Sequence, residues 1–233
     1  MLILKKRVNK DFIYKYRYVI GGALALAIAG FVIYKSRPKK KEEPIKEDFK
    51  LGNTTSTEGG LIFSMPVSKF SEYPVVVVFG GISYATPSWI MGQVPKELLS
   101  KALFVFAPYT MPYSTVSQKI NDFVAKNKLL VKNTSVIGFS AGGFNAAKAY
   151  NKNFKFIGLI DPTTKKENLS TVYGNNVRMV YNDSNWGGYP QVKAALPTLA
   201  TIVNNVGGSA EKVSLKHDKM PSYFFDKYKN EIV

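Results

Sequence analysis

Runs of apolar residues alternate with segments of helical periodicity along residues 59–233. The clearest run is Val75–Phe79, which is rich in β-branched residues and leads directly into Gly80 and Gly81, as in a buried strand. Similar runs predict strands at residues 103–108, 135–139, 154–160, 177–181 and 212–216. Spacings of three and four residues predict helices at residues 87–101, 114–128, 144–151, 191–206 and from 221 onward. This alternation predicts an α/β domain with a doubly wound, mostly parallel sheet.

A different pattern precedes this domain. Residues 19–34 carry no charge, and they are flanked by Tyr18 and Tyr34 and by lysines and arginines on both sides. A helix of this length spans roughly 24 Å, which is slightly short of a hydrocarbon core of about 30 Å, but flanking lysines can extend to the interface. We expect one transmembrane helix here; a buried core helix and a cleaved signal peptide are the alternatives.

The predicted organisation follows from these patterns. Residues 1–18 are a basic N-terminal segment, 19–34 the transmembrane helix, 35–57 a flexible linker, and 58–233 the α/β domain. Six basic residues precede the apolar segment and seven follow it within equal spans, so the positive-inside rule does not decide which side of the membrane the domain faces.

Charge changes this picture little. The net charge is +16, and it divides equally, because residues 1–57 carry 13 basic and 5 acidic residues and residues 58–233 carry 19 and 11. Only four of the 32 basic residues are arginines, whereas nucleic-acid recognition commonly uses arginine forks, so we expect no nucleic-acid partner. The absence of cysteine excludes disulfides and a cysteine nucleophile.

The strand predicted at residues 135–139 leads into Gly138-Phe139-Ser140-Ala141-Gly142 and then into a helical segment. This G-x-S-x-G sequence resembles the nucleophile elbow of the α/β-hydrolase family, in which a sharp turn exposes a serine hydroxyl above the sheet. The resemblance covers roughly residues 59–233. It implies a serine hydrolase with Ser140 as its nucleophile.

A serine nucleophile needs a base and an acid that orients the base. His217 is the only histidine of the chain and follows the last predicted strand, where the family places its base. Asp183 follows the strand at 177–181 and gives the family order serine, acid, histidine. We therefore predict the triad Ser140, Asp183 and His217. Asp161, at the end of the preceding strand, is the competing acid, because some members place it there.

The resemblance also implies donors for an oxyanion. The backbone N–H of Ala141, directly after the nucleophile, is the first predicted donor. The second should come from the loop after Phe79, where Gly80-Gly81 resembles the family's oxyanion loop. Gly81 and Ile82 are the candidates, and the sequence does not choose between them.

Aromatic residues follow several of the predicted strands. Tyr84, Tyr109 and Trp186 should lie on the carboxyl-end face of the sheet, where open α/β folds bind ligands, and we predict that they contact substrate. Only fifteen residues separate Asp161 from Val177, too few for a helical cap, so we expect an open site. A single histidine without cysteine argues against zinc, and we expect neither metal nor cofactor.

The sequence therefore predicts a membrane-tethered serine hydrolase that cleaves an ester or thioester through an acyl-enzyme. Its substrate would lie at the bilayer, for instance a lipid or an envelope glycan. Two alternatives use the same fold. One is an inactive hydrolase-like domain that serves binding or structure in a membrane or virion assembly, and the other is an acyltransferase with the same triad.

Overall fold

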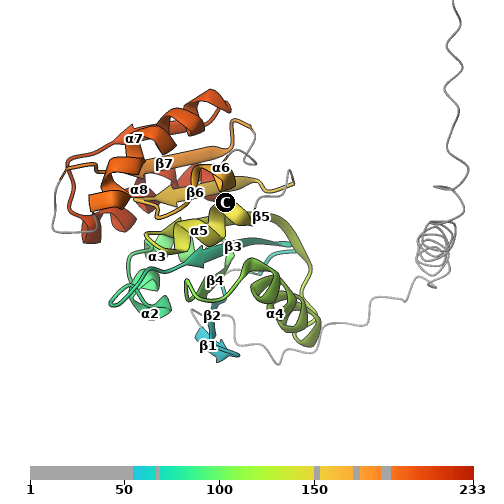
Figure 1. Cartoon of the computed structure of the whole chain (residues 1–233). Coiled ribbons are helices and arrows are strands. Elements are labelled where there is room, and N and C mark those ends of the chain that lie inside the picture. The colour runs from blue at the N-terminus through green and yellow to red at the C-terminus, as the bar shows by residue number, and fades with distance from the viewer. Residues whose placement is uncertain (1–54, 67–68, 150–152, 170–173, 185–189) are drawn as a thin grey trace, which may run out of the picture. The chain divides into compact units, whose positions relative to one another are not determined.

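The computed structural model describes residues 55–66, 69–149, 153–169, 174–184 and 190–233 (Figure 1). Their strands form one eight-stranded sheet in the order β1-β2-β4-β3-β5-β6-β7-β8. The strands are β1 (Thr55–Glu58), β2 (Leu61–Ser64), β3 (Tyr73–Phe79), β4 (Leu103–Ala107), β5 (Val131–Phe139), β6 (Phe156–Ile160), β7 (Val177–Tyr181) and β8 (Ser209–Lys212). β1 and β2 pair antiparallel at one edge, and every pairing from β4 to β8 is parallel. The predicted α/β class and mostly parallel sheet are confirmed.

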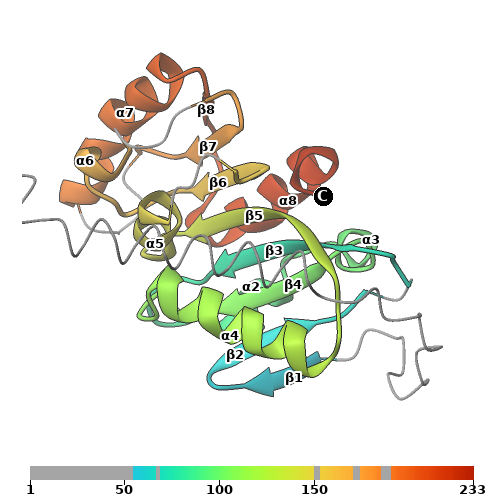
Figure 2. The same ribbon diagram turned by 90° about the vertical axis from the view of Figure 1, so that its right-hand side faces the viewer.

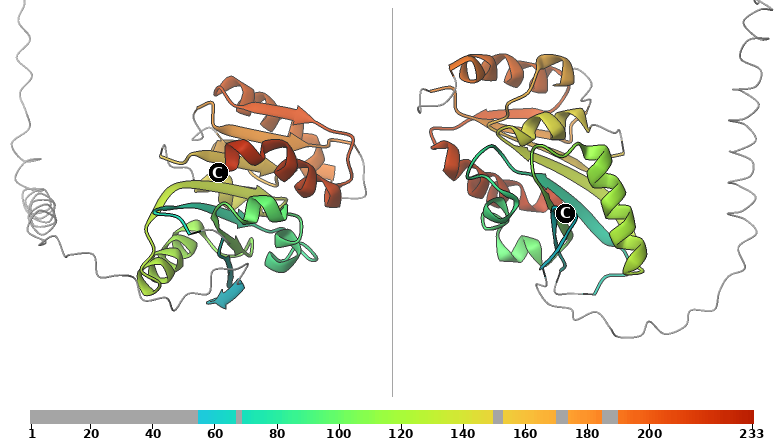
Figure 3. Two further views of the ribbon diagram at one scale, coloured as in Figure 1. Left: turned by 180° about the vertical axis from the view of Figure 1, so that it is seen from behind. Right: turned by 60° about the horizontal axis from the view of Figure 1, so that its bottom comes forward.

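Helices cover both faces of the sheet, as its apolar strands require. The helices are α2 (Pro87–Met91), α3 (Lys96–Leu99), α4 (Tyr113–Lys126), α5 (Gly142–Lys148), α6 (Lys166–Leu169), α7 (Pro190–Asn205) and α8 (Met220–Ile232). On one face Val75 and Val77 of β3 pack with residues of α4, α5, α6 and α7. On the other face Val76 and Val78 pack with α2, α3 and α8, and the view from behind in Figure 3 brings α8 to the front. The sheet is therefore doubly wound, and its twist is visible in Figure 2.

Two elements differ from their predicted extents. The helix predicted at residues 87–101 is two short helices, α2 and α3, separated at Gly92 and Pro95. Proline disfavours helical backbone at the residue before it, which explains the interruption. The last strand, β8, begins and ends earlier than residues 212–216, and His217 instead opens a short 3₁₀ helix, His217–Lys219.

Most of the N-terminal region predicted from the sequence lies outside the described residues. This holds for the basic segment 1–18, the apolar segment 19–34 and residues 35–54 of the linker. Residues 55–57, the end of the predicted linker, belong to strand β1. Across the ranges that the structure describes, no helix has the length and apolar character that a bilayer crossing needs.

Candidate active site

Ser140 lies at the turn between β5 and α5 and has a left-handed backbone, with φ of +52°. The turn is possible because the residues two positions before and after Ser140 are glycines. A Cβ on Gly138 would lie 2.3 Å from the carbonyl oxygen of Gly142, and one on Gly142 would lie 2.3 Å from that of Gly80. A strained serine at a strand-to-helix turn is the geometry of a nucleophile elbow.

The backbone joins this elbow to the loop that follows β6. Ser140 N–H donates to the carbonyl of Ile160 at 2.9 Å, and Thr163 N–H donates to the carbonyl of Ser140 at 2.8 Å. Asp161, between these two partners, also has a positive φ, of +43°. The elbow and the Asp161 turn are therefore held side by side.

His217 contacts Asp161. Its Nδ1 lies 2.6 Å from Asp161 Oδ2, and the two side chains are 11% and 1% exposed. The imidazole also packs on Phe139, the residue before Ser140, with ring centroids 4.4 Å apart. The imidazole thus packs against the elbow, and its Nδ1 faces a buried carboxylate.

In the structure Asp183 has a partner other than His217, and the competing candidate, Asp161, is the carboxylate that contacts the imidazole. Asp183 forms an ion pair with Lys212 of β8 at 2.8 Å, and its side chain is 24% exposed. Its neighbour Asn182 is the residue that turns inward: its N–H donates to Asp161 Oδ1 at 3.1 Å, and its Nδ2 donates to the carbonyl of Leu215 at 2.8 Å. The alternative acid, Asp161, occupies the place expected of Asp183. One signal favoured it, because Asp161 ends a strand of uninterrupted apolar residues, whereas Asp183 lies in the polar sequence Asn182-Asp183-Ser184.

A second partner of Asp161, the lysine Lys193 of α7, was not predicted. Its Nζ lies 3.0 Å from Asp161 Oδ2 and 3.3 Å from Oδ1, and it also donates to the carbonyl of Asn182. The Lys193 side chain is only 8% exposed. Its position along α7 could have indicated this, because it precedes the buried residues Leu196 and Ala200 by three and seven positions on one helical face.

These contacts shift two pKa values. Burial alone would raise the pKa of Asp161, but hydrogen bonds from His217, Asn182 and Lys193 bring it below its ordinary value. Burial lowers the pKa of Lys193, and this effect outweighs the opposing pull of the Asp161 and Asp183 carboxylates. The lowered pKa of Asp161 favours an ionised carboxylate beside the imidazole, whereas burial makes the charged form of Lys193 less favourable than it is in water.

The structure distinguishes between the two candidate oxyanion donors of the β3 loop. Gly81 N–H already donates to the carbonyl of Ala85 at 2.9 Å, which leaves Ile82 as the candidate. A Cβ on Gly81 would lie 3.0 Å from the Cβ of Ser140, so the loop passes close to the nucleophile. Within the described ranges, neither Ile82 N–H nor Ala141 N–H has a hydrogen-bond acceptor in the protein. These two amides are therefore available to a ligand.

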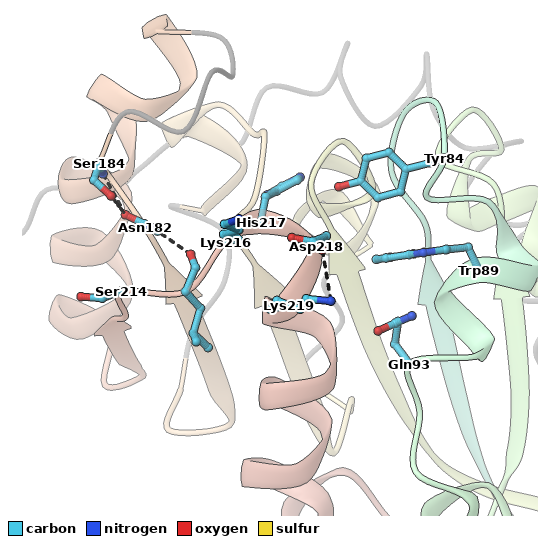
Figure 4. Close-up of a pocket in the computed structure, with 11 residues that line it drawn as sticks. Tyr84, Trp89, Gln93, Asn182, Ser184, Ser214, Lys216, His217, Asp218 and Lys219 are labelled. Carbon is cyan, nitrogen blue, oxygen red and sulfur yellow. Dashed lines mark hydrogen bonds and ion pairs between the residues drawn. The ribbon is translucent and has the colours of Figure 1, made fainter.

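An open cleft of about 950 Å³ adjoins His217 (Figure 4). Tyr84, Trp89 and Gln93 form one wall, and the opposite wall comes from the segments around Asn182 and His217. The full lining is Tyr84, Trp89, Gln93, Asn182, Ser184, Ser214, Leu215, Lys216, His217, Asp218 and Lys219. Burial raises the pKa of the Tyr84 phenol, and the charges of Asp218 and Asp161 add to this.

A row of contacting aromatic rings joins the cleft wall to the His217 imidazole. Tyr84 meets Trp89 edge to face at 5.1 Å, Trp89 stacks on Phe139 at 5.7 Å, and Phe139 contacts His217. The cleft wall and the base thus share one packed set of rings.

The three residues predicted to contact substrate have different positions. Tyr84 lines the cleft. Tyr109 does not line it, and its carbonyl instead accepts a hydrogen bond from Asn145 Nδ2 at 2.5 Å. Trp186 lies outside the described residues.

Comparison with known proteins identifies the fold. No family model matches the sequence, and no curated protein matches it. Among solved structures, the chain is similar to an S-formylglutathione hydrolase from Agrobacterium tumefaciens, with a TM-score of 0.57, 9% identity and coverage of 77% of this chain and 94% of that one. A siderophore hydrolase from Aspergillus nidulans has a TM-score of 0.52 and 10% identity, with coverage of 74% of this chain and 90% of that one. A carboxylesterase from Mesorhizobium loti has a TM-score of 0.51 and 11% identity, with coverage of 76% of this chain and 98% of that one. The chain therefore has the α/β-hydrolase fold, and its strand order and elbow agree with that fold.

Proposed function

We propose that the protein is a serine hydrolase that cleaves a carboxylic ester through a covalent acyl-enzyme. The observation that carries the proposal is the contact of 2.6 Å between His217 and the buried Asp161, beside a strained serine elbow. Ser140 and Asp161 directly follow the neighbouring parallel strands β5 and β6, and His217 follows β8 in the short 3₁₀ helix, which supports assigning the three to one site. A serine that serves only structure has no need of this arrangement.

Acylation would use each group as its geometry allows. Ser140 Oγ attacks the ester carbonyl while His217 Nε2 accepts the hydroxyl proton, and the new bond places negative charge on the carbonyl oxygen. The N–H groups of Ala141 and Ile82 donate to that oxyanion. The imidazolium is stabilised by Asp161, which stays ionised, and it then protonates the departing alkoxide so that the alcohol leaves.

Deacylation repeats these steps with water. His217 removes a proton from a water molecule, the resulting hydroxide attacks the acyl-enzyme carbonyl, and the same two amides bind the oxyanion. Collapse of the intermediate breaks the bond to Ser140 Oγ, which regains its proton from His217. The products are a carboxylic acid and the alcohol.

The similar structures support the choice of ester chemistry. Their names describe a siderophore hydrolase, an S-formylglutathione hydrolase and a carboxylesterase, which are all hydrolases. Thioesters remain within the proposal, because the same attack and the same oxyanion contacts apply to them.

The cleft beside His217 favours a substrate that is bulky or surface-presented. It is open, and its two walls combine the rings of Tyr84 and Trp89 with the cationic side chain of Lys216 and the ion pair of Lys219 with Asp218. Aromatic rings suit an acyl chain or the face of a sugar, and ammonium groups suit a phosphate or carboxylate nearby. We include in this proposal a lipid or an envelope glycan that carries an ester.

We also propose that residues 19–34 anchor the chain in a bilayer and that residues 35–57 tether the domain to it. The uncharged segment and its basic, tyrosine-containing flanks support this. An anchor of this kind would restrict the enzyme to substrates at or near that bilayer.

A fluorophosphonate probe tests the proposed chemistry on the full-length chain, because it forms a covalent bond only with an activated serine. We expect labelling of the wild-type protein and none of Ser140→Ala or His217→Ala. Ser214→Ala, at a serine that lines the cleft, is the matched control and should label normally. A folded wild-type protein that resists the probe would instead favour a non-catalytic binding domain.

A further inference from the structure

The carboxylate of Asp161 has two nitrogen partners at the same oxygen. Oδ2 lies 2.6 Å from His217 Nδ1 and 3.0 Å from Lys193 Nζ. The proposed hydrolytic cycle uses only the first contact. We propose that Lys193 is a positioning residue, which shares the Asp161 carboxylate with His217 and thereby keeps the base unprotonated to lower pH. This inference rests on the proposed function, since it assigns a role within the same site.

The contacts of Asp161 fix its carboxylate in place. Oδ1 accepts from Asn182 N–H at 3.1 Å and from Lys193 Nζ at 3.3 Å, while Oδ2 accepts from Lys193 and faces His217. The Asp161 side chain is 1% exposed and that of Lys193 is 8% exposed. Rotation of the carboxyl group would break contacts at both oxygens, and little water is available to replace them.

Lys193 also reaches the base by a second route. Its Nζ donates to the carbonyl of Asn182, and Asn182 Nδ2 donates to the carbonyl of Leu215 at 2.8 Å, two residues before His217. Helix α7, the end of β7 and the segment that carries the base are thus joined through one ammonium group. The position of His217 therefore depends on α7.

The effect on protonation follows from charge. Without Lys193, the Asp161 carboxylate would be available in full to stabilise an imidazolium. With Lys193, an ammonium group already contacts the oxygen that faces His217. Protonation of the ring then places two positive groups around one carboxylate, which makes protonation less favourable. A like charge close to a titratable group disfavours the charged form of that group. Lys193 should therefore extend the range over which His217 can accept a proton from serine to lower pH.

Other charged groups near the site have partners that moderate their effect. Asp183 pairs with Lys212 at 2.8 Å and acts on Lys193 from the β7 loop. Asp218 pairs with Lys219 at 3.4 Å on the 3₁₀ helix and acts on Tyr84, and Lys216 lines the cleft next to the base. Among these side chains Lys193 is the most deeply buried cation, and burial is the condition under which a charge acts with least screening.

The test is an NMR titration of the imidazole in the full-length chain. His217 is the only histidine, so ¹⁵N-labelled histidine reports on this ring alone. We expect the titration midpoint in Lys193→Met to rise by about one pH unit, whereas Lys193→Arg, which keeps the charge, should stay within about 0.3 unit of wild type. Lys212→Met, which removes an exposed lysine paired with Asp183, should also stay within about 0.3 unit.

A folded Lys193→Met protein whose ring titrates like wild type would overturn the proposal. Lys193→Gln provides a second neutral variant that keeps a donor, in case methionine beside the buried carboxylate prevents folding. The wild-type protein gives a check that needs no substitution. A charged, buried ammonium should show a slowly exchanging ¹⁵N–¹H resonance at pH 7, and its assignment to a neutral amine would also overturn the proposal.

Kinetics separate this inference from the proposed function. On an ester substrate, the acid limb of the kcat/KM profile should move to higher pH in Lys193→Met, by the same amount as the NMR midpoint. A purely structural role would lower the plateau without moving the limb. If the wild-type chain hydrolyses no ester, the proposed function fails, but the NMR titration still decides whether Lys193 acts on His217.

Discussion

Asp161 and Asp183 are chemically identical side chains, and the structure gives them different surroundings. Asp161 is buried among three donors, whereas Asp183 faces Lys212 at the surface. A carboxylate can orient an imidazole only where it is held against the ring and protected from water. The distinction between the two is therefore a property of the loops that carry them.

This difference predicts opposite kinetic outcomes for two matched substitutions. Asp161→Asn should lower kcat by about 10³- to 10⁴-fold, because the amide can hold His217 in the wrong tautomer. Asp183→Asn should leave kcat within about threefold, since it removes only an exposed ion pair. Steady-state hydrolysis of a chromogenic ester by both variants measures this. The reverse ranking would restore Asp183 as the acid.

Asp161 should also shape the acid stability of the domain. Its pKa is lower folded than in the unfolded chain, so its contribution is fully present above the ordinary carboxyl value of 3.8 and is lost as pH falls through the folded value. The free energy of unfolding, measured with urea, should therefore fall more steeply between pH 5 and pH 2 for the wild-type protein than for Asp161→Asn. Asp183→Asn should follow the wild-type curve. Parallel curves for wild type and Asp161→Asn would contradict the shift.

The sequence pointed to Ser140 and His217 as candidates because their signals are local or unique. The elbow is a short pattern set by steric crowding, and the chain has one histidine. It favoured Asp183 over Asp161, because the contact of Asp161 with His217 depends on a positive φ at Asp161 and on the inward turn of Asn182, which the sequence does not show. It missed Lys193, since a lysine in an amphipathic helix is ordinarily a solvent-facing residue and the carboxylate that accepts it is 32 positions away.

At the scale of elements, the sheet was predictable because a strand covered on both faces is apolar at every position. The boundaries were less so. In residues 87–101, Val94 and Leu98 have the four-residue spacing of one helix and are both buried, yet the segment forms two separate helices, α2 and α3. The spacing therefore predicted correctly which residues are buried. The helix is interrupted because Pro95 restricts the backbone at and before its own position.

The packing of α5 against β3 gives a prediction at this scale. Gly142→Ala would place a Cβ 2.3 Å from the Gly80 carbonyl oxygen and 2.5 Å from that of Phe79, and backbone atoms cannot move aside readily. We expect a loss of about 3 kcal/mol in the free energy of unfolding, together with loss of activity. Urea denaturation measures the first and ester hydrolysis the second.

Gly92→Ala is the matched control for this substitution. Its φ of −64° is helical, and the nearest atom to an added Cβ, the Trp89 carbonyl oxygen, lies at 3.3 Å. It should change stability by less than about 1 kcal/mol. Equal losses in the two variants would mean that the elbow is not specifically crowded.

At the scale of the whole molecule, the chain combines a hydrolase-fold domain with an N-terminal region of different character. The net charge of +16 is most concentrated around residues 19–34, where lysines and arginines flank an uncharged segment. Basic residues at both ends of an apolar helix interact favourably with anionic headgroups. The proposed membrane anchor and the proposed hydrolase activity thus rest on different parts of the chain and can be tested separately.

The proposed anchor predicts how the protein fractionates. Replacing both Leu26 and Ile28 with Asp would place two charges near the centre of the segment, at a cost of about 2.5 to 3.5 kcal/mol each. The double variant should leave the membrane pellet after an alkaline carbonate wash, whereas the wild-type chain should remain. A double Asp variant at Thr54 and Thr55, outside the segment, is the control. Release of the wild-type chain by carbonate would exclude a spanning anchor.

The two backbone hydrogen bonds between the elbow and the Asp161 turn have a consequence for how this machinery can change. Ile160, Ser140 and Thr163 are joined at 2.9 and 2.8 Å, so the backbone of the elbow is tied to that of the Asp161 turn. His217 follows residues 213–216, which continue beyond β8 and are held by two bonds, from Val213 N–H to the carbonyl of Tyr181 at 2.9 Å and from Asn182 Nδ2 to the carbonyl of Leu215 at 2.8 Å. We expect any adjustment between acylation and water attack to come from the histidine segment, because the elbow and the Asp161 turn are tied directly to each other. We therefore expect substitutions that change the turnover number to occur mainly in residues 213–219, whereas the elbow and the Asp161 turn should tolerate few changes.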